Sequence, residues 1–259
     1  MVKLYFLGTG GFAASARRDN TSFFVRAGDS AILIDCPGSV IQKIKKMKMD
    51  PCEAKTILIT HVHADHVYGL PSLVHSLMME NMHVKLVGSR ESVTFCRKLL
   101  HLFGLLQNKI KYRIDFVSLE AGDSCELSSG IVCHTYDVPH SSSSLAFRLK
   151  FEQEGIDLVY SGDSPIHAPL FQWAEKSNYL IHDCGAPSRI FDLDPHLKTM
   201  HTHSLDLGKH AHQAGIKCLI LCHIFTEMDF EDNELEEEIR KNYDGRLIIP
   251  EDFQEIQLA

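Results

Sequence analysis

Several features of other protein classes are missing from this sequence. No apolar run approaches the ~20 residues that cross a bilayer, so no membrane-spanning helix is expected. The eight cysteines form no Cys-x-x-Cys pair, a distribution that fits buried free thiols in a reducing compartment. Positive charge is scarce, with 26 Lys and Arg against 34 Asp and Glu, which argues against a protein that grips polyanions over its whole surface.

Linkers, low-complexity tracts and internal repeats are also absent, so residues 1–259 are predicted to form a single domain. The N-terminus, "MVKLYFLGTGG", has an apolar run too short for a secretion signal. We therefore expect a cytoplasmic protein with no membrane partner.

Short β-branched or aromatic runs alternate with amphipathic stretches in both halves of the chain. Two packed sheets covered by helices would satisfy this pattern, so the predicted fold is α/β, a four-layer αββα sandwich. Strands are expected at 3–7, 22–25, 31–35, 56–60, 84–87, 114–119, 131–137, 146–151, 158–161, 179–181, 218–221, 247–249 and 256–258, and helices near 40–49, 71–80, 91–103, 205–214 and 232–243.

Histidine is abundant, with 16 residues, and clusters in "THVHADHVYGLP" after an apolar strand. His61 and His63 are two residues apart, which in extended backbone directs both imidazoles to one side. Asp65 and His66 follow in the turn that begins a helix, so the motif can present two pairs of ligands to two nearby points. Imidazole and carboxylate suit zinc, manganese or iron(II). The alternative, a surface loop rich in histidine, is disfavoured because the cluster follows a buried strand.

Three further candidate ligands also follow apolar strands. His140 lies in "DVPHSSSS", Asp163 in "YSGDS" and His223 in "LCHI". Each alone is more typical of a structural residue, but together with the histidine cluster they favour a dinuclear site. The two oxygens of Asp163 could bridge the two cations.

A second concentration of histidines lies in "LIHDCG" and "MHTHSLDLGKHAHQAG". Ser204 is a good N-cap for the helix expected from Leu205, which places His203 just before a helix N-terminus. There a histidine could contact a phosphate oxygen or pass a proton to a leaving group. The roles of His182 and His201 stay open.

The chain resembles metallo-β-lactamase-fold hydrolases of the ribonuclease Z-like branch almost from end to end. "FLGTGG", "SARRDNTSFFV" and "LIDCPG" are similar to the opening of that family, and "THVHADHVYGLP" matches its His-x-His-x-Asp-His-x-x-Gly-Leu-Pro motif. This resemblance implies a homodimer and two divalent ions, Zn²⁺ or alternatively Mn²⁺ or Fe²⁺. It assigns one ion to His61, His63 and His140 and the other to Asp65, His66 and His223, with Asp163 between them.

The resemblance also implies catalytic roles. Asp65 would orient a bridging hydroxide or accept its proton, and His203 in "THSL" would stabilise the oxyanion or protonate the leaving group. The family's His-Glu-Ala-Thr segment reads "HDCG" here, so Asp183 replaces the glutamate that steadies the catalytic histidine.

One departure bears on the substrate. The tRNA-processing members insert a long Gly- and Pro-rich arm between the motifs of His140 and Asp163, whereas only residues 141–162 lie there in this chain. The missing arm and the net charge of −8 favour a phosphodiesterase for small or cyclic phosphodiesters, such as cyclic nucleotides. The alternatives are a tRNA 3′-end endonuclease acting on an RNA 3′ end, and a non-phosphate hydrolase of the thioesterase or lactonase type.

Overall fold

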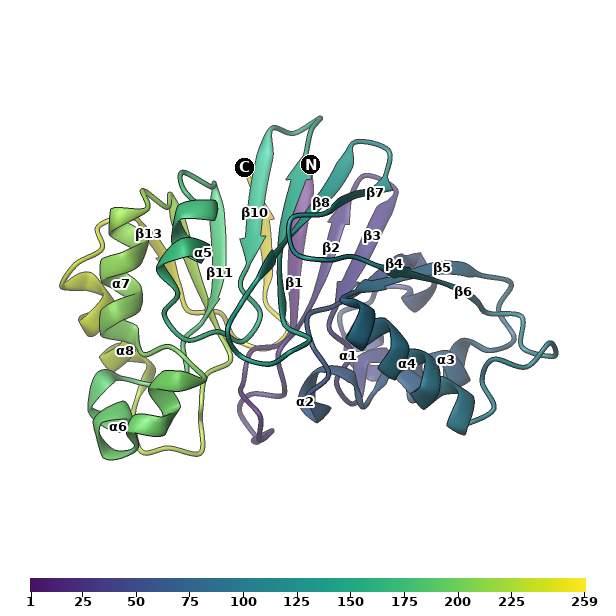
Figure 1. Cartoon of the computed structure of the whole chain (residues 1–259), viewed down its shortest axis with the longest axis horizontal. Helices are drawn as coiled ribbons and strands as arrows, with labels where there is room; N and C mark the ends of the chain where they lie inside the picture. Colours follow the sequence, from purple (N-terminus) through teal and green to yellow (C-terminus); the bar gives the residue numbers. More distant parts are fainter.

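The computed structural model describes all residues 1–259 as two seven-stranded sheets that pack face to face between helices (Figure 1). The first sheet has the order β14-β1-β2-β3-β4-β5-β6 and the second β13-β12-β11-β10-β9-β8-β7. The first contains β1 (Val2–Gly8), β2 (Ser22–Ala27), β3 (Ser30–Ile34), β4 (Ala54–Ile59), β5 (His83–Gly88), β6 (Arg113–Ser118) and β14 (Glu255–Leu258). The second contains β7 (Ser124–Ser128), β8 (Ile131–Asp137), β9 (Leu145–Phe151), β10 (Ile156–Tyr160), β11 (Tyr179–Asp183), β12 (Cys218–Cys222) and β13 (Arg246–Ile248).

Helices cover the outer face of each sheet, at opposite sides of Figure 1. None of them combines the length and the apolar composition needed to cross a bilayer. On the first sheet lie α1 (Val40–Lys46), α3 (Leu70–Leu77) and α4 (Arg90–Leu102), with the short α2 (Ala64–Val67) at the sheet edge; the second half carries α5 (Ala168–Trp173), α6 (Ser188–Leu193), α7 (Ser204–Gln213) and α8 (Asp232–Arg240).

Side chains point alternately to the two faces of each strand, and this alternation produces the four layers. In β1, Leu4 and Phe6 face the second sheet, while Tyr5 and Leu7 join the cluster beneath α1, α3 and α4. In β11, Ile181 points into the inter-sheet core and its neighbours point outward towards α5 and α7. The predicted αββα sandwich is confirmed.

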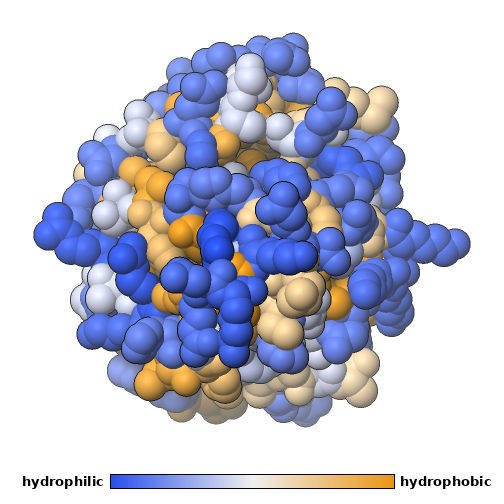
Figure 2. All heavy atoms as spheres, turned by 90° about the vertical axis from the view of Figure 1, so that its right-hand side faces the viewer, coloured by the Kyte–Doolittle hydropathy of each residue, from blue (hydrophilic) through white to orange (hydrophobic).

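The face that carries α3 and α4 is mostly hydrophilic, with apolar side chains between the polar ones (Figure 2). Leu102 and Phe103, at the end of α4, are 80% and 66% exposed. Such scattered apolar exposure is normal for a folded protein and needs no ligand to explain it.

Some elements differ from the predicted ones. The strand β7 and the helices α5 and α6 were not expected from the sequence, because each is short and lacks a clear period. Helix α7 begins at Ser204 instead of Leu205, and its N-cap is His203, whose Nδ1 accepts a hydrogen bond from the amide of Asp206 at 3.4 Å. Helix α8 ends at Arg240, before the predicted Tyr243.

Glu238 of α8 ties together the first residues of α6 and α7. Its carboxylate accepts hydrogen bonds from the Ser188 amide at 2.8 Å and from the hydroxyls of Ser188 and Ser204. Burial opposes ionisation, but these hydrogen bonds prevail and lower the pKa of Glu238. A group with a depressed folded-state pKa stabilises the protein above its unfolded pKa and loses that contribution as the pH falls.

We therefore expect Glu238→Gln to lower the free energy of unfolding at pH 7 by on the order of 1 kcal/mol, since the carboxylate is partly solvent-screened. The difference from wild type should shrink as the pH falls below the ordinary carboxyl value of 4.5. Urea unfolding at pH 7 and pH 4 measures the loss of unfolding free energy and its dependence on pH. The matched control is Glu237→Gln, which changes an exposed neighbour. A difference that is the same at both pH values would contradict this account.

Candidate metal centre

The histidine motif lies in the turn that joins β4 to α2. Strand β4 is buried on both faces and ends at Ile59, which brings His61 to the carboxyl edge of the first sheet, where parallel strands present ligands. His63 keeps extended backbone (φ −61°, ψ 149°) and serves as N-cap of α2. In Figure 1, α2 marks this edge, which lies opposite the two chain termini.

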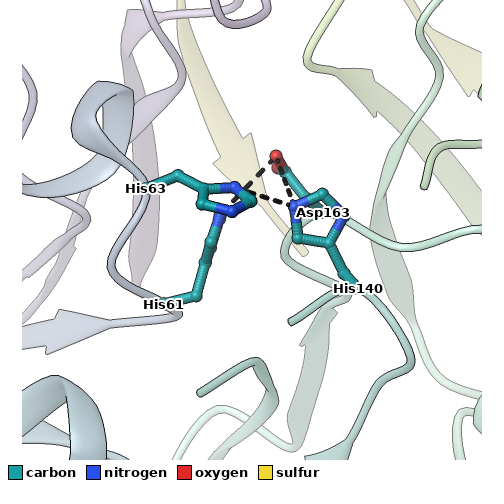
Figure 3. Close-up of side chains that lie close together, drawn as sticks. All are labelled: His61, His63, His140 and Asp163. Atoms are coloured by element: carbon teal, nitrogen blue, oxygen red, sulfur yellow. Dashed lines mark hydrogen bonds and ion pairs between the residues drawn. The ribbon is translucent and has the colours of Figure 1, made fainter. Parts of the chain in front are cut away.

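The structure brings four predicted ligands into a first group. His61, His63, His140 and Asp163 place their ligand atoms within 4.8 Å of one another. Figure 3 shows the two histidines of the β4–α2 turn meeting His140 and Asp163, which come from the second sheet. The Nε2 of His140 lies 3.0 Å from Nδ1 of His63 and 3.7 Å from Oδ2 of Asp163.

A second group shares Asp163 with the first. It contains Asp65, His66, Asp163 and His223, again within 4.8 Å. Oδ2 of Asp163 lies 3.3 Å from Nε2 of His66 and 3.0 Å from Nε2 of His223. Oδ2 of Asp65 lies 3.4 Å from Nε2 of His66 and 3.5 Å from Nε2 of His223. All seven predicted ligands thus lie together, in two groups that meet at one carboxylate.

Unpaired buried atoms show that this donor set suits a cation. Nε2 of His61, His66 and His223 and Oδ1 of Asp163 are buried without a hydrogen-bond partner. Buried polar atoms are nearly always paired, so such a concentration in one place calls for a ligand. Imidazole nitrogens and carboxylate oxygens converging on shared points are the donors of divalent transition-metal ions. The chain therefore binds divalent metal.

The electrostatics divide the histidines into two kinds. Burial lowers the pKa of His61 and His140, so both are neutral and ready to bind a cation. Burial would also lower the pKa of His223, but the Asp163 carboxylate outweighs it and raises the pKa to about 10. Without metal, the proton on His223 offsets the negative charge of the neighbouring carboxylates. Metal binding at this histidine must therefore release a proton.

A ring of outer partners holds the ligands in place, and the sequence had given no role to its central member, Asp35. Oδ1 of Asp35 accepts the amide of Thr60 at 2.8 Å, and Oδ2 accepts Nδ1–H of His66 at 2.9 Å. Thr60 Oγ1 in turn lies 3.0 Å from Nδ1 of His61. Asp35 was visible only as the polar residue that ends a buried strand, the same signal that identified Asp163. Such partners fix ring orientation and leave the other nitrogen for the metal.

We expect Asp35→Asn to weaken metal affinity by about 10–100-fold, since an amide NH₂ would face the donor nitrogen of His66. A competitive zinc titration against a chelator measures this. The matched control is Asp115→Asn, which breaks a surface pair with His83 (2.8 Å). Equal affinities for both variants would show that Asp35 does not orient the ligands.

Asp183 has a different partner from the expected one. Its Oδ2 accepts Nδ1–H of His201 at 2.8 Å. The ring of His201 stacks on that of His223, with centroids 4.9 Å apart and an interplanar angle of 14°. His201 therefore lies directly over the metal ligands, held by the buried carboxylate that the resemblance paired with the catalytic histidine.

His203 is engaged elsewhere. Its Nε2 lies 3.0 Å from Oδ2 of Asp206, and its Nδ1 accepts the Asp206 amide. Both nitrogens thus contact one residue of α7. The pairing of Asp183 with His203 implied by the resemblance is corrected here: the two histidines are two residues apart, and only the fold shows which one turns towards Asp183.

His182 lies outside the centre. It alternates with Asp183 along β11, so its ring points to the outer face and stacks on Phe171, with centroids 5.2 Å apart. Its Nδ1 donates to the Asp183 carbonyl at 2.8 Å. The open question about His182 is therefore answered by a structural role.

The chain is similar to known proteins in sequence and in fold. The family described as "Anti-Pycsar protein Apyc1" matches residues 2–235. The ribonuclease Z of Methanosarcina acetivorans is 23% identical, across 100% of this chain and 98% of its own. The metallo-β-lactamase fold protein YhfI of Bacillus subtilis superposes with a TM-score of 0.82 at 18% identity, covering 99% of this chain and 100% of YhfI. Human tRNase Z, short form, superposes with a TM-score of 0.80 at 18% identity, covering 99% of each chain.

These likenesses confirm the predicted resemblance to ribonuclease Z-like proteins and the metallo-β-lactamase fold. Together with the histidine and aspartate groups, they support a metal-dependent hydrolase. The match over most of its length shows that the chain belongs to the anti-Pycsar protein Apyc1 family.

Proposed function

We propose that the protein is a phosphodiesterase that uses two divalent metal ions, with zinc as the first ion to test and manganese or iron(II) as alternatives. The observation that carries the proposal is the pair of ligand groups that share Asp163. His61, His63 and His140 would hold one ion, and Asp65, His66 and His223 the other. Bound ions of this kind activate water as a nucleophile and offset the charge of a phosphate.

The chain's own residues would handle the protons. Asp65 is the more accessible carboxylate of the centre, with a 13% exposed side chain, and would accept the proton of the attacking water. We assign the proton donor to His201 instead of the predicted His203. The Oδ2 of Asp183 accepts Nδ1–H of His201 and fixes the direction of the ring, which leaves Nε2 of His201 to deliver a proton to the departing oxygen.

Two substrate classes fit this chemistry. The relatives named ribonuclease Z favour the RNA 3′ end, the alternative in our sequence analysis, over the small phosphodiester placed first there. We therefore propose RNA 3′-end cleavage as the first activity to test. One specific observation, the absence of the arm, favours the second candidate substrate, a small or cyclic phosphodiester.

The segment between His140 and Asp163, where the tRNA-processing relatives insert the arm, is a short hairpin in this chain. Strands β9 and β10 form a tight antiparallel hairpin in which Phe151 pairs with Ile156, so only residues 152–155 turn the chain. The alignment with the Methanosarcina protein runs over 310 positions against 259 residues here, so that relative contains segments this chain lacks. A hairpin of this size offers no extended surface for a folded RNA.

The deciding experiment offers the zinc- or manganese-loaded protein a tRNA precursor with a 3′ trailer, cyclic nucleotides and bis(p-nitrophenyl) phosphate in parallel. Cleavage of the precursor at the trailer junction supports ribonuclease activity, and rapid hydrolysis of cyclic nucleotides with an intact precursor supports the small-diester alternative. Hydrolysis of a thioester or lactone, with all phosphodiesters intact, would refute the proposal. Asp163→Asn serves as the inactive control.

A further inference from the structure

Beside the metal centre, two aromatic side chains stand exposed. Phe12 is 60% exposed on the loop between β1 and β2, and Tyr68 is 50% exposed at the end of α2. That loop (purple) hangs from the same edge as α2 in Figure 1. Exposed apolar side chains are common in folded proteins, but these two residues lie beside the metal centre and share a hydrogen-bond partner, Asn20.

Asn20 holds both aromatic residues in place. Its buried amide donates to the carbonyls of Gly11 and Phe12 at 2.7 Å and 3.1 Å. Its Oδ1 accepts the hydroxyl of Tyr68 at 3.1 Å. Asn20 therefore ties the main chain at Phe12 to the side chain of Tyr68.

Phe12 is also linked to the metal ligands by ring contacts. Its ring meets the buried Phe225 edge-on, with centroids 5.8 Å apart. Phe225 in turn meets His223 edge-on at 5.5 Å and His201 at 5.1 Å. Gly11 permits this approach, because a Cβ there would lie 2.5 Å from the Phe225 ring. One buried ring, that of Phe225, thus lies between Phe12 and a metal ligand.

We propose that Phe12, supported by Tyr68, is a stacking platform for the nucleobase next to the scissile phosphate. This deepens the proposed function and rests on it, because the phosphate must occupy the metal centre. Stacking on an aromatic ring is worth about 1–3 kcal/mol per base and tolerates every base, so the site would select nucleotides over phosphates that carry no base.

The test compares the affinities of the zinc-loaded protein for uridine 5′-monophosphate and for inorganic phosphate by calorimetry. Wild type should bind the nucleotide at least about tenfold more tightly, and Phe12→Ala should remove most of that ratio. Phe12→Tyr should retain it. Phe95→Ala, which removes a 39% exposed ring of α4, is the matched control and should retain it as well.

Three outcomes would overturn the platform: a wild-type ratio near one, a ratio unchanged in Phe12→Ala, or a ratio retained by Phe12→Leu, which has apolar bulk but no ring. Hydrolysis of methyl p-nitrophenyl phosphate by the same samples tests the proposed function separately, since that diester has no base. If this diester and the nucleotide substrates all stay intact while the affinity ratio behaves as expected, the catalytic proposal fails and the binding platform stands.

Discussion

Asp163→Asn is expected to lower the rate of phosphodiester hydrolysis by at least about a hundredfold and to reduce the bound metal. Asp163 is the only residue common to both ligand groups, and one of its oxygens lies within 3.3 Å of both His66 and His223. An asparagine keeps the shape but removes the charge, so the surrounding imidazoles lose their shared anionic partner.

Elemental analysis of the purified variant and a zinc titration measure the metal, and a rate assay on bis(p-nitrophenyl) phosphate measures the chemistry. Asp192→Asn, which alters a surface carboxylate paired with Lys198, should match wild type in both. An Asp163→Asn protein with the wild-type metal content and rate would remove the shared carboxylate from the proposal. Circular dichroism distinguishes a lost metal site from a misfolded chain.

The second large effect concerns the two neighbouring histidines. His201→Ala is expected to lower the rate constant of the chemical step by about a hundredfold or more, because the departing oxygen loses its proton donor. Asp183→Asn should give a smaller loss, since the asparagine can still contact His201 but no longer holds its Nδ1–H with a carboxylate oxygen. His203→Ala should retain most of the activity and instead lower stability by about 1 kcal/mol, because it removes the N-cap of α7.

The leaving group separates proton donation from a merely structural effect. p-Nitrophenolate leaves readily without a proton, whereas a ribose oxygen does not, so His201→Ala should slow the nitrophenyl ester far less than a nucleotide substrate. Equal losses on both substrates would indicate that His201 only supports His223. A severe loss in His203→Ala with an unaffected His201→Ala would restore the assignment implied by the resemblance.

Much of this molecule could be predicted from local patterns. The apolar, buried end of β4 at Ile57, Leu58 and Ile59 and the His-x-His spacing after it needed no tertiary information, because side-chain direction follows backbone period. The alternation of strands and helices likewise predicted the four layers, since each apolar face must be covered. The short elements β7, α5 and α6 were not predicted, because a few residues carry too little periodicity to be distinguished from a turn.

By itself the sequence determined the fold class, the seven candidate ligands and the hydrolytic chemistry, since these depend on residue types, periodicity and a specific motif. Only the tertiary structure decided which distant groups meet: that Asp35 supports His66, that Asp183 turns to His201 instead of His203, and that Phe12 stands beside the metal centre. The physical reason is that hydrogen bonds and ring contacts depend on side-chain direction in three dimensions. Two histidines separated by one residue look alike in a sequence, but in the fold one faces the buried carboxylate and the other caps a helix.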